Sequence, residues 1–218
     1  MSRGLPLAFV GLTVRRMPRK PRDERPGYHH VVTRGNNKQT IFLTDRDRLT
    51  FLAMLEMEAI RHDWTILAYC LMRNHYHLVV RIADELARGM RNLNGFYALY
   101  FNDAHGRINH LFGKRYWSEF TESDAHLKNA IRYVLQNPRR AGAKGTLAEH
   151  PWTSYRASTG HEFGPRGFSR QELLQLFGRD PVTAQAAFVA FCDEPAPQRQ
   201  DETGRYQVPA PNLRVSLT

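Results

Sequence analysis

The sequence predicts an α+β fold, with a ferredoxin-like antiparallel sheet and helices on one face. Strand-like and helix-like apolar spacings follow one another in the order strand, helix, strand, strand, helix, strand, helix. Two of the strands are separated by only a short turn, which favours antiparallel pairing. With 218 residues the chain is long enough for one such domain and an extension.

Four strands are expected from short runs of apolar and β-branched residues. They cover residues 28–34, 64–71, 75–81 and 114–121. The second and third strands form either a hairpin or one long strand. The pair Arg73-Asn74 favours a tight turn between them.

Three main helices are expected, each after a residue that can cap it. The first begins near Arg46 and shows a broad apolar side made of Leu49, Leu52, Ala53, Leu55, Met57 and Ile60. The second follows Ala83-Asp84, and its apolar residues are spaced by three or four. The third runs from Ala125 to about Asn137, where Pro138 ends it.

The composition divides the chain into four parts. Residues 1–25 are expected to be a flexible basic arm, residues 26–157 the main domain, residues 158–193 a helical extension and residues 194–218 a disordered tail. Met17 is an alternative start to Met1.

The charge balance indicates a polyanionic partner, either nucleic acid or an anionic membrane surface. Lys and Arg number 31 against 21 Asp and Glu, which gives a net charge of +10.

The apolar run Leu5–Val14 is too short to span a bilayer, and Arg15-Arg16 follows it where a signal peptide would have small residues. We therefore expect no membrane span and a cytoplasmic protein. Two cysteines do not make a disulfide framework.

The segment His75-Tyr76-His77 lies within a strand-like run. Because side chains alternate along a strand, His75 and His77 should share one face and Tyr76 should take the other. Two imidazoles side by side form half of a divalent-metal site. The alternative is that they form the polar face of an amphipathic strand and bind nothing.

The third helix carries a second pair of polar residues. On a wheel of about 100° per residue, its core arc is formed by Leu127, Ala130, Ile131, Val134 and Leu135. Tyr133 and Asn137 lie together at the edge of this arc, whereas Arg132 and Gln136 lie opposite it. The edge pair is either a solvent-facing pair with no role or a nucleophile with a helper ligand beside it.

Together, His75, His77 and Asn137 could offer three neutral ligands to Mg²⁺ or Mn²⁺. Such an ion would make a phosphodiester more electrophilic, which Tyr133 needs because a phenol is a poor nucleophile unaided. The reaction expected is in-line attack by Tyr133, with a covalent phosphotyrosine as the product. Since the ester energy is retained, this step can reverse onto a new strand.

Four blocks of sequence resemble the single-tyrosine HUH transposases, which are IS200-like, and within them the REP-associated tyrosine transposases. They are Pro26–Asn37, Tyr69–Val80, His110–Trp117 and Arg132–Gly142, with Trp152–Tyr155 after them. A lone His-x-His is a weak signal, but four blocks in this order are a strong one.

The resemblance implies the HUH endonuclease fold and a role for each matching residue. His75 and His77 match the metal-binding histidines, Tyr133 the nucleophile and Asn137 the third polar ligand. The family cuts and rejoins single-stranded DNA near hairpins through a 5′-phosphotyrosine and needs Mg²⁺ or Mn²⁺. Its members are monomers or homodimers.

Two residues depart from the family pattern. Arg73 stands where relatives have proline, and it either loosens the turn or adds a phosphate contact. Tyr76 replaces an aliphatic residue, so its buried hydroxyl needs a partner.

DNA contacts are expected from basic and amide side chains that flank the candidate site. Ordinary solvated charges are the alternative. The candidates are Arg34, Asn36, Asn37, Lys38, Arg73, Lys114, Arg115, Arg139 and Arg140. His29 and His30 are also able to bind metal, but the sequence does not place them at the site, and a structural role is expected for His30.

Two other functions remain open at this point. One is a domesticated, non-catalytic DNA-binding regulator, against which the intact candidate residues argue. The other is a metal-dependent hydrolase with no covalent step, which would keep its activity without the Tyr133 hydroxyl.

Overall fold

The computed structural model describes residues 23–195, and it contains one four-stranded antiparallel sheet. The strand order is β2-β3-β1-β4, with bounds β1 Gly27–Arg34, β2 Thr65–Met72, β3 His75–Ile82 and β4 Trp117–Phe120. The α+β ferredoxin-like class is confirmed, as is the tight turn between β2 and β3. Apart from residues 23–25 and 194–195, the expected arm and tail lie outside the described residues, as does the choice of start.

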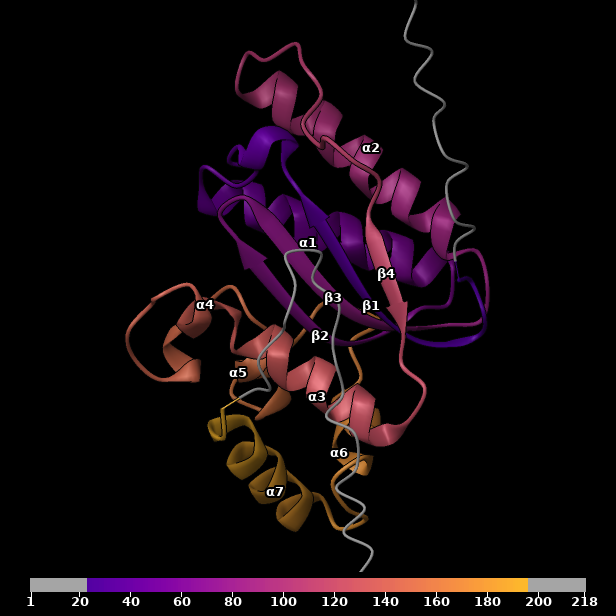
Figure 1. Cartoon of the computed structure of the whole chain (residues 1–218), viewed down its shortest axis with the longest axis vertical. Helices are drawn as coiled ribbons and strands as arrows, with labels where there is room; N and C mark the ends of the chain where they lie inside the picture. The colour runs from indigo at the N-terminus through magenta and orange to yellow at the C-terminus, as the bar shows by residue number, and fades with distance from the viewer. Residues whose placement is uncertain (1–22, 196–218) are drawn as a thin grey trace, which may run out of the picture.

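Helices cover both faces of the sheet, so the expectation of one covered face was too narrow (Figure 1). One face carries α1 Asp45–Arg61 and α2 Leu86–Ala104. The other carries α3 Asp124–Leu135, and the chain then adds α4 Asn137–Arg140, α5 Tyr155–Ser158, α6 Arg170–Gln175 and α7 Pro181–Asp193. The physical reason is that β2 and β3 are buried along nearly their whole length, which requires apolar cover on both sides.

The first core lies between the sheet and the α1–α2 layer. Tyr76 of β3 is fully buried there and packs against Phe51 of α1, with ring centroids 4.5 Å apart. Its hydroxyl donates to Asn94 Oδ1 at 2.6 Å, so the partner required for this buried phenol is present. Tyr97 and Phe101 of α2 complete the aromatic cluster.

The second core joins α3 and the helical extension to the other face of the sheet. Cys70 and Val79 from the strands pack with Ile131 of α3 and Phe188 of α7. The backbone of Ile66 also accepts a hydrogen bond from Ser169, just before α6. The α6 and α7 helices therefore share a core with the main domain.

Several element boundaries and faces differ from the sequence expectations. On α1, Leu49, Met57 and Ile60 are exposed, because the buried stripe follows Phe51 and Leu55. β4 is shorter than expected, because only Trp117–Phe120 pairs with β1. The cap of α2 is Glu85, in a left-handed conformation, instead of Ala83-Asp84. No helix among residues 23–195 is long and apolar enough to cross a membrane.

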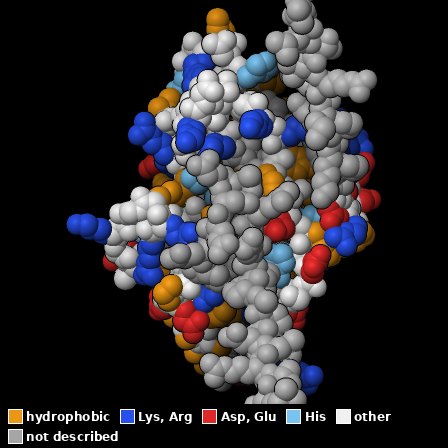
Figure 2. Space-filling view, in the orientation of Figure 1, with side chains coloured by type: hydrophobic (Ala, Val, Ile, Leu, Met, Phe, Trp, Pro, Cys, Tyr) orange, Lys and Arg blue, Asp and Glu red, His pale blue; other side chains and the backbone are white. Residues whose placement is uncertain are grey.

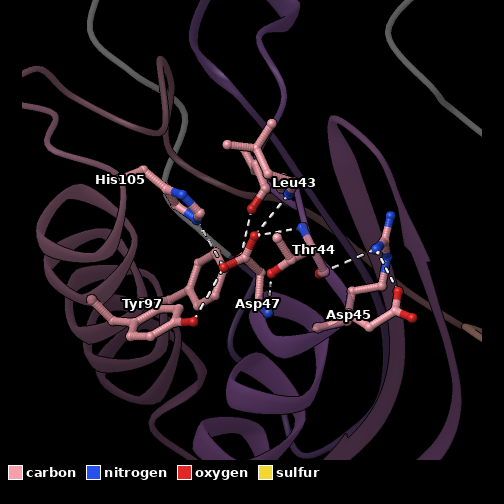
Figure 3. A network of polar contacts seen from close by, with 9 residues as sticks. Leu43, Thr44, Asp45, Asp47, Tyr97 and His105 are labelled. Carbon is pink, nitrogen blue, oxygen red and sulfur yellow. Dashed lines mark hydrogen bonds and ion pairs between the residues drawn. The ribbon is translucent and has the colours of Figure 1, made fainter.

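The start of α1 is fixed by a buried carboxylate, Asp47 (Figure 3). Its Oδ2 accepts from the backbone N–H groups of Leu43 and Thr44, each at 2.8 Å. Its Oδ1 accepts from Tyr100 at 3.1 Å and lies 2.9 Å from His105 Nε2, and both of these residues are on or just beyond α2. The Asp47 side chain thus caps α1 and also links α1 to α2 by hydrogen bonds.

The pKa of Asp47 reflects the same contacts. Burial alone would raise it, but the hydrogen bond from His105 and those from the two backbone N–H groups outweigh burial and lower the pKa. The stability that Asp47 contributes is therefore present above the pKa of an unfolded Asp, about 4, and is lost as the pH falls through the lowered pKa.

We expect Asp47→Ala to reduce the free energy of unfolding by about 3 kcal/mol at pH 7, because buried donors lose a charged acceptor. Urea denaturation followed by circular dichroism measures the change, and the difference from wild type should narrow below pH ~4. The control is Asp45→Ala in the same turn, whose exposed carboxylate should contribute at most about 0.5 kcal/mol. Equal losses in the two variants would contradict this assignment.

Candidate active site

The two histidines of β3 lie on the face opposite Tyr76, as expected. His77 pairs with Val32 of β1 and with Cys70 of β2, and these residues belong to the face that α3 covers. The His75 and His77 rings are 5.1 Å apart between centroids. The alternation of the strand therefore brings both imidazoles under α3.

A third histidine, His30 of β1, joins this group, which the sequence did not place there. It is fully buried, and its Nε2 lies 3.0 Å from His77 Nδ1. A histidine that binds metal commonly has its second ring nitrogen held by such a partner. The sequence shows that His30 and Val32 share a face of β1, but only the pairing of β1 with β3 shows which face this is.

His75 is held on both sides of its ring. Its Nδ1 lies 2.7 Å from Asn74 Oδ1, and its ring also contacts the Asn137 side chain. Burial lowers the pKa of His75 to about 4, the charge of Arg34 lowers it as well, and the Asn137 contact opposes them. His75 is therefore neutral at pH 7, the form in which imidazole binds a metal.

Tyr133 points from α3 toward the histidines. Its ring centroid is 5.7 Å from that of His77 and 5.8 Å from that of His30, and both contacts are edge-to-face. The guanidinium of Arg140 lies 4.8 Å from the Tyr133 ring centroid. The side chain is half-buried, so the edge position predicted on the helical wheel corresponds to a place beside the histidines.

Asn137 begins α4, one turn after Tyr133, and is buried. Its Nδ2 donates to the Tyr133 carbonyl at 3.2 Å, and its side chain also contacts the His75 ring. The helix breaks here because Pro138 lacks an N–H, and α3 ends at Leu135 instead of Asn137.

The donor set fits a divalent ion that prefers mixed nitrogen and oxygen ligands. Among residues 23–195, no three His, Cys, Asp or Glu side chains gather to hold a metal. A site here would therefore use His75 and His77 with the amide oxygen of Asn137. Because Asn74 lies at His75 Nδ1, the Nε2 atom of His75 is the one that would bind the ion.

The side of α3 opposite its core arc is buried as well. Arg132 and Gln136 are buried beneath the end of α7. Arg132 stacks on the Phe191 ring at 4.0 Å and pairs with Glu194 at 3.0 Å, and Gln136 donates to the Cys192 and Glu194 carbonyls. The end of α7 thus packs on α3, the helix that carries Tyr133.

The candidate DNA-binding residues fall into three groups. Arg34 lies opposite His75 in the β1–β3 ladder, and Arg140 lies on Tyr133. A second group lies at the turn after β1, where the Asn36 N–H donates to the Leu111 carbonyl; it contains Asn36, Asn37, Lys38 and Arg73. Lys114 and Arg115 follow Gly113, which lies against Asn36. Arg139 differs from the others, because it contacts Gly145 and Asp193 instead of the site.

Residues 26–137 match the family model for IS200-like transposases. This chain belongs to the IS200-like transposase family. Transposases of this family cut and transfer DNA strands, and the resemblance noted in the sequence is confirmed. No curated protein matches this transposase.

Three solved structures resemble this transposase at low sequence identity. The REP-associated tyrosine transposase bound to a REP hairpin aligns with a TM-score of 0.56 at 15% identity, over 66% of this chain and 86% of that one. A putative transposase from Deinococcus radiodurans gives a TM-score of 0.39 at 13% identity, over 59% and 100% of the two chains. The Saccharomyces cerevisiae tRNA(His) guanylyltransferase gives 0.41 at 12% identity, over 81% and 85%. The match to the REP-associated tyrosine transposase shows that the two proteins share a fold.

We expect Arg132→Ala to lower the free energy of unfolding by about 2 kcal/mol, because it removes a buried stack and the donor to the end of α7. Urea denaturation provides the measurement. Arg156→Ala is the matched control, since its pair with Glu162 is partly exposed and should contribute less than about 1 kcal/mol. An unchanged midpoint for Arg132→Ala would show that α7 does not stabilise α3.

Proposed function

We propose that this transposase is a metal-dependent enzyme that cleaves and rejoins single-stranded DNA at hairpin sites through a 5′-phosphotyrosine. The observation that carries the proposal is the placement of the Tyr133 ring beside His77, with Asn137 contacting both Tyr133 and His75. These residues come from β3, α3 and α4, so their meeting is a result of the fold.

In the proposed reaction, Tyr133 Oη attacks the phosphorus in line with the 3′ oxygen. The Oη–P bond forms, the P–O3′ bond breaks, and the phenolic proton passes to the leaving oxygen, which becomes a 3′-hydroxyl. Attack of a 3′-hydroxyl on the phosphotyrosine reverses the exchange and joins strands. Arg140 and Arg34 flank the place where the phosphate charge would lie.

His75, His77 and Asn137 are the residues that would hold Mg²⁺ or Mn²⁺. When bound, such an ion would supply Lewis-acid polarisation of the scissile phosphate. His30 holds the His77 ring in place, and the neutral state of His75 allows binding without loss of a proton.

A single-stranded DNA hairpin is the proposed substrate. The neighbour with the shared fold is bound to a REP hairpin. Lys and Arg side chains gather on the upper part of the face seen in Figure 2, which suits a phosphate backbone. A cytoplasmic location and a monomeric or homodimeric state remain predictions.

We expect Tyr133→Phe to abolish the covalent adduct, because phenylalanine lacks the Oη atom that would form the bond to phosphorus. The assay incubates end-labelled hairpin DNA with Mn²⁺ and separates adducts on a denaturing gel. Tyr155→Phe, on α5, is the matched control and should form the adduct at the wild-type rate.

The same gel separates the alternatives. Cleavage that survives in Tyr133→Phe would indicate hydrolysis by water and would disprove the covalent step. Binding without cleavage, across hairpins taken from the DNA beside the gene, would favour a non-catalytic regulator.

We expect His75→Ala to weaken Mn²⁺ binding by more than about 100-fold, since loss of an outer-shell partner alone commonly costs 10- to 100-fold. Electron paramagnetic resonance of free Mn²⁺ during titration gives the affinity without any DNA. His161→Ala, in the exposed loop after α5, is the control. Equal affinities in the two variants would place the metal elsewhere.

A further inference from the structure

Asn74, in the turn between β2 and β3, connects His75 to the turn after β1. Its Nδ2 donates to the Lys38 carbonyl at 3.0 Å. Its Oδ1 lies 2.7 Å from His75 Nδ1. One amide therefore touches both the ring of a proposed metal ligand and the backbone of a separate turn.

The chemistry of these atoms fixes the orientation of the ring. A backbone carbonyl can only accept, so the NH₂ end of Asn74 must face Lys38 and the oxygen end must face His75. The amide oxygen also only accepts, so His75 Nδ1 must carry the proton. Nε2 then keeps its lone pair, on the side of the ring where Asn137 lies.

We propose that Asn74 is a positioning residue that holds the His75 ring in the Nδ1–H tautomer, with Nε2 presented to the metal. This inference rests on the proposed function, in which His75 is a ligand. Asn74 itself touches neither metal nor substrate in this scheme.

The turn that carries the Lys38 carbonyl is held by contacts that do not involve the Asn74 side chain. Asn37 and Lys38 both have left-handed backbones, with φ of 48° and 59°, which cost energy in residues other than glycine. Backbone hydrogen bonds from Gly35 to the Asn74 carbonyl and from Ile41 to the Arg73 carbonyl, each 2.9 Å, hold this turn. Shortening the Asn74 side chain should therefore leave the turn and the Lys38 carbonyl in place.

The first readout is the tautomer of His75 in the metal-free protein at pH 7, read from long-range ¹H–¹⁵N correlations of the ring. Wild type should show the Nδ1–H form, and Asn74→Ala should show a mixture of both tautomers. Asn74→Asp loses the hydrogen bond to the Lys38 carbonyl but keeps an oxygen that accepts from Nδ1, so it should return the ring toward the Nδ1–H form. If Asn74 had only a structural role, Asn74→Ala and Asn74→Asp would not differ in the tautomer of His75.

The second readout is Mn²⁺ affinity, measured by paramagnetic resonance on the full chain without DNA. Asn74→Ala should bind Mn²⁺ about 10- to 100-fold more weakly, the usual effect of losing an outer-shell partner. Asn74→Asp should recover most of this loss. Asn102→Ala is the matched control, because the Asn102 amide also donates to a loop carbonyl but does so from α2.

Retention of the Nδ1–H tautomer in Asn74→Ala, with an affinity within twofold of wild type, would overturn the assignment. Failure of the proposed function gives a different pattern. If wild type binds no Mn²⁺ while the tautomer still changes as expected, His75 is oriented by Asn74 but the metal proposal is wrong.

Discussion

The structure depends on β3 being buried on both of its faces. Tyr76 fills the core on one side, and His75 and His77 lie beneath α3 on the other. Because side chains alternate, a shift in register by one residue would send the imidazoles into the aromatic core and Tyr76 toward α3. The hydrogen bond from Tyr76 to Asn94 and the packing on Phe51 oppose this shift. The aromatic core therefore determines where the polar site lies.

The position of Tyr133 follows from packing on two sides of α3. The arc around Ile131 and Val134 packs on the sheet, and the arc around Arg132 and Gln136 packs beneath the end of α7. A helix held on two sides cannot rotate about its axis without losing one of these contacts. Tyr133 and Asn137 lie between these two packed sides, where they face the histidines. This gives the helical extension a physical role in positioning the proposed nucleophile.

Local pattern and motif were enough to predict the four strands and the three main helices α1, α2 and α3, the shared face of His75 and His77, and the pairing of Tyr133 with Asn137. These features depend on periods of two and 3.6 residues, which are visible in a single sequence. The place of His30 was not predictable, because it depends on which strands are neighbours and in what register. The burial of Arg132 was missed for a related reason, since a charged residue opposite the core arc becomes buried only when a distant helix covers it.

The chemistry of the proposed ligands also constrains how metal and substrate would bind. His75 and His77 as imidazoles, with the amide of Asn137, supply no negative charge to offset a divalent ion. Arg34 and Arg140 add positive charge at the same place. A phosphate group is the natural counter-ion for this arrangement, so in the proposed function metal and DNA would each strengthen binding of the other by the same factor. A neutral ligand set would therefore favour occupancy of the site when the scissile phosphate is present.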